Sequence, residues 1–107
     1  GKPIQKIAVL GDMLELGVHE KKFHEDIAEL ESIKFLDRVH CIGELMEGLH
    51  RNLSGKIKGL SIRSPKDLLP HLLTTIQDRD VYMVKGSNSI GLSLVVAELC
   101  KLNGQVI

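Results

Sequence analysis

The stretch KIAVLGDMLELG, residues 6–17, joins an apolar run to a loop that holds two glycines and two acids. The continuous run IAVL is typical of a strand that is covered on both faces of a sheet. Gly11 lets the chain leave that strand with unusual backbone angles, and Gly17 allows a second tight turn. Asp12 and Glu15 therefore lie just past the end of a predicted buried strand.

Apolar strands and amphipathic helices alternate along the rest of the chain. The apolar runs predict strands at Ile4–Leu10, Arg38–Ile42, Gly59–Ile62 and Val81–Val84, with a possible short edge strand at Gln105–Ile107. The helical spacing predicts helices at His19–Ile33, Glu44–Leu53 and Ser89–Leu102. A further helix begins at Ser64-Pro65, and Pro70 either kinks it or delays its start.

This alternation predicts an α/β fold with a mainly parallel sheet and helices on both faces. Ligands of such folds bind beyond the carboxyl ends of the strands. The candidate site therefore includes Gly11 and Asp12 after one strand and the residues after Val84. We expect residues 1–107 to form a single domain. The start GKPIQ, which has no initiator Met, is expected of a fragment of a longer protein, although a processed or tag-derived terminus would look the same.

The composition excludes several classes of partner. Lys plus Arg and Asp plus Glu both number 14, and Phe, Tyr and Trp make up only 3% of the residues. Neither a basic field nor a stacking platform for nucleic acid is expected. No apolar run reaches the ~18–20 residues that a membrane span needs. Cys41 and Cys100 lie in apolar runs without a CxxC spacing, so we expect two buried, reduced thiols in a cytoplasmic protein.

A second candidate loop has the sequence VKGSNS at residues 84–89. Gly86 permits close approach of the backbone, Ser87 or Asn88 can cap the next helix, and Lys85 adds a positive charge. These features favour an anion, although a capped helix with a solvated lysine explains them equally well. Neither GxxxxGK[ST] nor GxGxxG occurs in the chain.

The acids of the first loop also have two interpretations. Asp12 is placed to hold a ribose hydroxyl, a metal-bound water or an ammonium group, or it forms an Asx turn with its own loop amides. Met13, Leu14 and Leu16 are expected to anchor the loop in the core. His19 and His24 are five positions apart and lie on different helix faces. No three or four ligands have the spacing of a zinc site, so no metal site is predicted.

Three segments resemble, in order, the C-terminal domain of the Mur ligases. They are IAVLGDMLELGVHEKKFHEDIAE at 7–29, DRVHCIGELM at 37–46 and DVYMVKGSNSIGLSLVV at 80–96. GDMxELG together with VKGS is similar to the family members that add D-alanyl-D-alanine to UDP-N-acetylmuramoyl-tripeptide. The DNPR signature of the sister ligase that adds the third residue is missing. The resemblance implies a Rossmann-like, three-layer domain.

The resemblance also implies a reaction. Enzymes of this family are cytoplasmic, and they use ATP to phosphorylate the terminal carboxylate of the precursor. The amine of D-alanyl-D-alanine attacks the acyl phosphate, and phosphate leaves. ATP and Mg²⁺ are held mainly by a central domain that this chain lacks. The C-terminal domain closes over ATP and helps to position the dipeptide, so the isolated domain is expected to be inactive. We also expect a monomer, because no exposed apolar helix stripe stands out in the sequence.

The resemblance assigns roles to residues that match the family motifs. Gly11 and Asp12 correspond to the nucleotide-binding side, whereas the chain holds no complete catalytic set. The expected substrate-binding residues are Glu15, His19, Lys85, Gly86, Ser87 and Asn88. Asn88 departs from the arginine that is common in the family, and it cannot supply that charge.

Two other functions remain open from the sequence. One is a free-standing α/β module that binds a small anion with the same two loops. The other is a relative of the folylpolyglutamate synthases, which share the wider ligase family. The sequence upstream of this chain would separate these alternatives, because a GKT-type loop and a uridine-nucleotide-binding domain would identify a Mur ligase.

Overall fold

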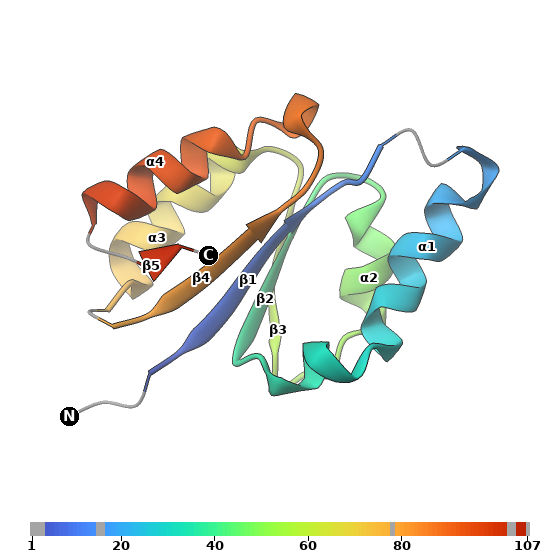
Figure 1. The fold of residues 1–107 in the computed structure, drawn as a ribbon, viewed down its shortest axis with the longest axis horizontal. Helices are drawn as coiled ribbons and strands as arrows, with labels where there is room; N and C mark the ends of the chain where they lie inside the picture. The colour runs from blue at the N-terminus through green and yellow to red at the C-terminus, as the bar shows by residue number, and fades with distance from the viewer. Residues whose placement is uncertain (1–3, 15–16, 78, 103–104, 107) are drawn as a thin grey trace.

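The computed structural model describes residues 4–14, 17–77, 79–102 and 105–106, with a parallel sheet at its centre (Figure 1). Its strands are β1 (Lys6–Gly11), β2 (Arg38–Ile42), β3 (Lys58–Ile62), β4 (Val81–Lys85) and β5 (Gln105–Val106). They lie in the order β3-β2-β1-β4-β5, and every neighbouring pair is parallel. The edge strand predicted near the end of the chain is thus confirmed for Gln105–Val106.

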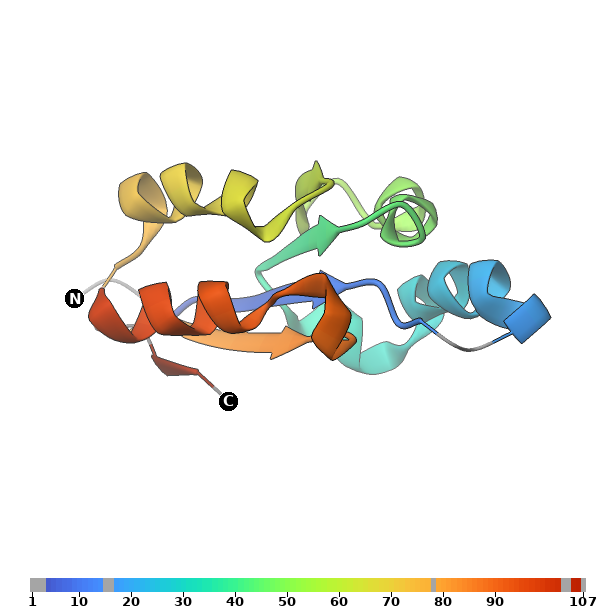
Figure 2. The same cartoon turned by 90° about the horizontal axis from the view of Figure 1, so that it is seen from above.

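Helices cover both faces of the sheet, as Figures 1 and 2 show. The α-helices are α1 (Glu20–Asp26), α2 (Met46–Asn52), α3 (Leu69–Thr75) and α4 (Ser93–Lys101). Short 3-10 turns are η1 (Gly17–His19), η2 (Ile27–Glu29), η3 (Glu31–Phe35), η4 (Pro65–Leu68) and η5 (Asn88–Ile90). The predicted α/β, three-layer architecture with a parallel sheet is confirmed.

Alternate residues of β1 feed two hydrophobic cores, because successive side chains of a strand point to opposite faces. Ile7 and Val9 belong to a core with residues of α3 and α4. Ala8 and Leu10 belong to a second core, which includes residues of α2 and η3. β1 is therefore buried on both sides, as its continuous apolar run predicts.

Three of the predicted helices are shorter than their apolar spacing indicated. The helix predicted at Glu44–Leu53 is α2, which covers Met46–Asn52. The helix predicted at His19–Ile33 is α1 followed by 3-10 turns, because Leu30 is extended with ψ 135° and ends the helical path. The last helix begins at Ser93 and not Ser89, since Gly91 has a φ of 82° and separates it from η5. Pro70 lies in the first turn of α3, so the late start is the correct alternative there.

Exposure corrects three further expectations. Cys41 is buried as predicted, but Cys100 is exposed because it lies on the outer side of α4. Leu14, expected in the core, is 36% exposed, and Leu16 lies outside the described residues. Phe23 and Leu30 are about half exposed beside an apolar groove, although the monomer prediction assumed no such exposed apolar surface. The monomer itself stays a prediction. Within the described residues no helix is long and apolar enough to cross a membrane.

Candidate functional site

The chain reverses its direction of travel across the sheet between β1 and β4. From β1 it moves outward to β2 and β3, and it then returns to place β4 on the other side of β1. Such a switch point opens a crevice between the loops that follow the two central strands. Leu10 is paired with Lys85 at this end of the sheet. The two loops predicted from the sequence therefore meet at one edge, at the upper end of the sheet in Figure 1.

Hydrogen bonds join these two loops directly. The Ser87 amide donates to the Asp12 carbonyl at 3.1 Å. The Leu14 amide donates to Ser87 Oγ at 2.8 Å. The prediction that Ser87 or Asn88 caps the last helix is wrong, because α4 starts six residues after Ser87 and has no side-chain cap. Ser87 instead holds the first loop against the second.

Gly86 lets the end of β4 approach Leu92 and the end of β1 closely. A Cβ atom at Gly86 would lie 2.5 Å from Leu92 Cδ1 and 3.0 Å from the Gly11 Cα. A Cβ atom at Gly11 would lie 3.0 Å from the same leucine methyl. The two glycines thus let β1 and β4 end side by side beneath Leu92. The close approach predicted at Gly86 is explained by this packing without any ligand.

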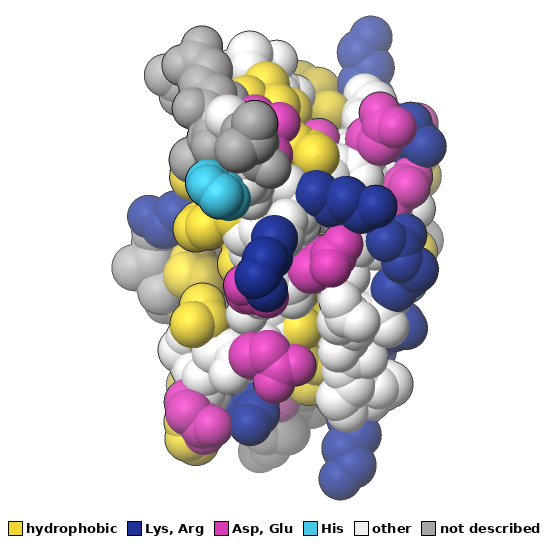
Figure 3. All heavy atoms as spheres, turned by 90° about the vertical axis from the view of Figure 1, so that its right-hand side faces the viewer, with side chains coloured by type: hydrophobic (Ala, Val, Ile, Leu, Met, Phe, Trp, Pro, Cys, Tyr) yellow, Lys and Arg dark blue, Asp and Glu magenta, His cyan; other side chains and the backbone are white. Residues whose placement is uncertain are grey.

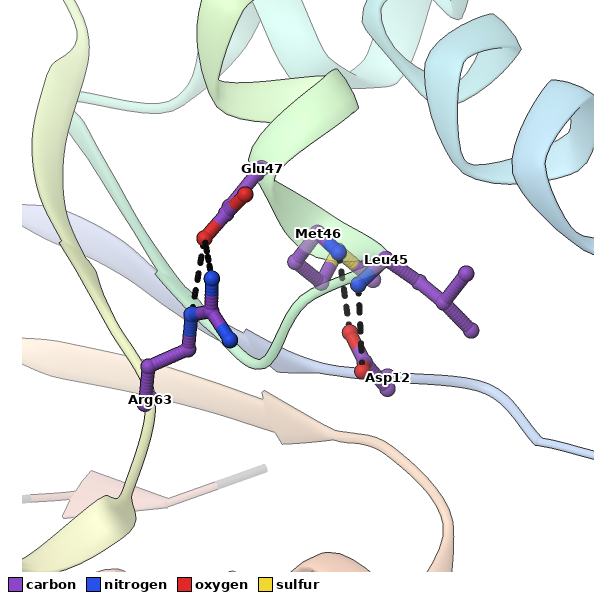
Figure 4. Close-up of polar contacts among 5 residues, drawn as sticks. All are labelled: Asp12, Leu45, Met46, Glu47 and Arg63. Carbon is purple, nitrogen blue, oxygen red and sulfur yellow. Dashed lines mark hydrogen bonds and ion pairs between the residues drawn. The ribbon is translucent and has the colours of Figure 1, made fainter.

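The Asp12 carboxylate is buried and engaged with the start of α2 (Figure 4). Its Oδ1 accepts a hydrogen bond from the Met46 amide at 2.8 Å, and Oδ2 accepts one from the Leu45 amide at 3.2 Å. A carboxylate is favourable there because helix amides point toward it and carry partial positive charge. The Asx-turn alternative is wrong, since the partners lie on another segment. Direct contact between Asp12 and a nucleotide stays a prediction.

The residues just before α2 leave room for the Asp12 carboxylate. Gly43 has a φ of 112°, and a Cβ atom there would lie 2.4 Å from the Asp12 Cγ. Burial, and to a smaller extent Asp12, raise the pKa of the Cys41 thiol to about 12. On the other side of the first turn, Arg63 Nη2 pairs with Glu47 Oε1 at 2.7 Å (Figure 4). Both β1 and the segment after β3 therefore position the start of α2.

His24 fixes the loop after β1 from the side of α1, a role that sequence reasoning missed. The ring is fully buried, and its Nε2 accepts a hydrogen bond from the Met13 amide at 2.9 Å. Its Nδ1 contacts the Glu20 carbonyl, which requires the proton to be on Nδ1. The signal in the sequence was a single histidine at a position otherwise predicted to be helical. Its partner could not be found from spacing, because Met13 lies in the loop.

The groups left for a ligand at the switch point are few. Lys85 ends β4 and is exposed, and His19 is exposed at the start of α1. Glu15 lies outside the described residues, and for Asn88 the structure describes the backbone alone. Lys85 thus supplies the positive charge at this edge among the predicted residues. The described part of the chain holds no group of three or more His, Cys, Asp or Glu side chains suited to a metal.

The face next to α1 and α2 carries charges of both signs (Figure 3). Acidic and basic side chains alternate over it, and hydrophobic side chains gather along one side of the view. The exposed Phe23 and Leu30 border an apolar groove that Met83 also lines. This face has no single strong sign of charge, so its electrostatics favour neither a cationic nor an anionic partner.

No family model matches the chain, but curated relatives do. It is 32% identical over 99 residues to the UDP-N-acetylmuramoyl-tripeptide–D-alanyl-D-alanine ligase of Bacillus subtilis. The aligned region covers 89% of this chain and 21% of that protein. The ligase of the same name from Synechocystis is 30% identical over 101 residues, covering 92% and 22%. The one from Rickettsia prowazekii is 23% identical over 91 residues, covering 85% and 20%.

Solved structures agree with these relatives. The MurF ligase of Thermotoga maritima in complex with ADP aligns with a TM-score of 0.68 and 30% identity, covering 92% of this chain and 22% of that one. A MurF structure from Acinetobacter baumannii aligns with a TM-score of 0.69 and 25% identity, covering 89% and 21%. The chain therefore spans about one fifth of the length of the proteins that it matches.

Proposed function

We propose that this chain, a Mur ligase domain related to the D-alanyl-D-alanine-adding enzymes, is the C-terminal domain of a cytoplasmic ligase of that specificity. The whole enzyme would join D-alanyl-D-alanine to UDP-N-acetylmuramoyl-tripeptide at the expense of ATP in peptidoglycan synthesis. The observation that supports this most is the pair of joined loops at the switch point, which leaves Lys85 exposed. A similar domain occurs in a MurF ligase that binds ADP.

The proposed reaction is a phosphoryl transfer followed by acyl transfer. The precursor carboxylate attacks the γ-phosphorus of ATP, which releases ADP and forms an acyl phosphate. The dipeptide amine then attacks the acyl carbon, loses a proton, and expels inorganic phosphate as the amide forms. Both steps gather negative charge on phosphate oxygens, and a lysine that approaches them stabilises that charge.

Within this scheme the chain supplies one wall of the site. Gly11 and Asp12 form the nucleotide side, with Asp12 holding the loop through α2. The loop from Lys85 to Asn88, together with Glu15 and His19, faces the dipeptide and the phosphoryl group that ATP transfers, with Lys85 next to the phosphate oxygens. Mg²⁺ and most phosphate contacts would come from the rest of the enzyme, as the resemblance to the Mur ligases implies.

The test is a pair of lysine variants in the longer ligase. Lys85→Ala is expected to lower kcat/KM for ATP by about tenfold or more, because a charge-assisted contact to phosphate is lost. Lys66→Ala is the matched control, as Lys66 is exposed at η4. Equal kinetics for both variants would contradict the proposal. The 107-residue chain alone is expected to form no amide bond, and robust ATP-dependent synthesis by it would also contradict the proposal.

A further inference from the structure

A cavity of about 390 Å³ lies at the opposite edge of the sheet from the switch point. It is formed by the amino-terminal parts of the central strands, the start of β3 and the end of α3. The polar groups that matter in it are Arg38, His40, Lys58, His71, Asp80 and Tyr82. Its volume is within the range of small-molecule sites, which combine apolar walls with a few placed polar groups.

Tyr82 contributes a hydroxyl without a partner. The residue is 1% exposed and lines the cavity. No described residue forms a hydrogen bond with this hydroxyl. Every fully enclosed side-chain polar atom of the described residues has a hydrogen-bond partner, so the Tyr82 hydroxyl is not fully enclosed. The hydroxyl therefore opens to the cavity. Burial, and secondarily Asp80, raise the pKa of Tyr82 to about 12, so the group keeps its proton and can donate it.

His40 is held as a second donor. The Leu60 amide donates to His40 Nδ1 at 3.0 Å, so the proton of the neutral ring is on Nε2. A Cβ atom at Gly59 would lie 2.5 Å from Nδ1, which shows how closely the backbone of β3 packs on the ring. Burial, then His71, then Arg38 lower the pKa of His40 to about 4. His71 packs edge-on against it, with ring centroids 5.1 Å apart.

Two cations lie at this cavity. Arg38 is exposed at the rim, where its Nη1 donates to the Lys58 carbonyl at 3.0 Å, and Lys58 itself lines the cavity. Among the lining residues that the structure describes, the one carboxylate belongs to Asp80. Its Oδ2 accepts a hydrogen bond from the Gln77 amide at 3.0 Å within its own turn. The described lining thus offers two donors and an excess of positive charge.

We propose that this cavity binds a small molecule through an oxyanion group, either a carboxylate or a phosphate. The Tyr82 hydroxyl and His40 Nε2 donate hydrogen bonds to the anion, and Arg38 and Lys58 balance its charge. The site lies away from the switch point, so it is a second ligand site of this domain. It does not depend on the ligase function proposed above.

The experiment is a titration of the 107-residue chain followed by NMR of the histidine ring protons. Inorganic phosphate and acetate are the probes, and sodium chloride at equal ionic strength is the control. We expect a saturable shift of the His40 and His71 signals with at least one probe, together with a rise in the measured pKa of His40. Comparison of the two probes identifies whether phosphate or carboxylate is the favoured group.

Variants make the test specific. Tyr82→Phe removes only the hydroxyl and is expected to weaken binding about fivefold or more. Arg38→Gln is a second variant at the rim that leaves the core unchanged, and Lys66→Gln removes an equal charge at η4 as its control. The proposal is overturned if sodium chloride reproduces the shifts, or if Arg38→Gln and Tyr82→Phe bind the probes as tightly as Lys66→Gln does.

Discussion

Asp12 and Met46 are 34 positions apart in the chain, and a hydrogen bond of 2.8 Å joins the Asp12 carboxylate to the Met46 amide. The bond fixes the end of β1 to the start of α2. Met13 and Leu14, which follow Asp12, are bonded to His24 and Ser87. The loop after β1 is therefore held from three directions before any ligand is considered.

Asp12→Ala is expected to lower the free energy of unfolding by about 3 kcal/mol, because it removes two hydrogen bonds to a buried carboxylate. Asp12→Asn keeps one acceptor oxygen and should lose about half as much. Urea denaturation followed by circular dichroism measures both. Asp26→Asn, on the exposed side of α1, is the control. If the Asp12 variants unfold at the same urea concentration as the control, the bonds to α2 do not stabilise the fold.

Gly43→Ala is expected to lower the free energy of unfolding more than a glycine-to-alanine substitution at an open surface position does. The new methyl group would meet the Asp12 carboxylate, and the backbone has a φ of 112° that side chains rarely adopt. Gly55→Ala is the matched control, because a Cβ atom there has no neighbour within 4 Å.

The clash and the backbone strain at Gly43 can be separated. In an Asp12→Ala background the carboxylate is absent and the clash is removed. Gly43→Ala should then lower the free energy of unfolding only through backbone strain at residue 43, by about 1–2 kcal/mol. A double-mutant cycle of unfolding free energies gives the coupling. Strict additivity of the two substitutions would contradict the close contact between these residues.

His24→Leu is expected to release the loop after β1 while preserving the bulk of the side chain. The Met13 amide loses its acceptor, so its hydrogen exchange should accelerate by about tenfold or more, and stability should fall by about 1–3 kcal/mol. Amide exchange by NMR measures the local effect. His19→Leu, at an exposed histidine, should leave Met13 exchange unchanged. Equal exchange in both variants would refute the anchoring role of His24.

His40 is expected to make the fold less stable in mild acid. Its pKa falls from 6.5 to about 4 on folding, so between these values the unfolded chain binds a proton that the folded chain does not. The contribution of neutral His40 to the free energy of unfolding is fully present above pH ~6.5. It is lost as the pH falls toward ~4, and the loss is about 3 kcal/mol.

Urea midpoints measured across this pH range test the role of His40. His40→Asn should flatten the dependence, while His19→Gln, at an exposed ring, should keep it. An unchanged slope in His40→Asn would assign the dependence to other groups.

The sequence predicts the architecture well because its signals are local. The apolar run before Gly11 and the alternation of strands and helices indicate a parallel sheet with two covered faces, and the structure has both. The boundaries of the first and last helices were wrong because Leu30 and Gly91 interrupt them through backbone angles that apolar spacing does not reveal. Ser87 was identified as a site residue, but its bond to Leu14 spans 73 positions.

The amino-acid sequence by itself determined which residues form the buried strands and which loops follow them, since hydrophobic periodicity acts between near neighbours. Tertiary structure decided where the side chains of those loops point. The carboxylate of Asp12 meets α2, and His40, Tyr82 and Arg38 line one cavity, only because the register of parallel strands places distant segments side by side. Burial then determines the outcome, because a polar group away from water must find a partner wherever the fold supplies one.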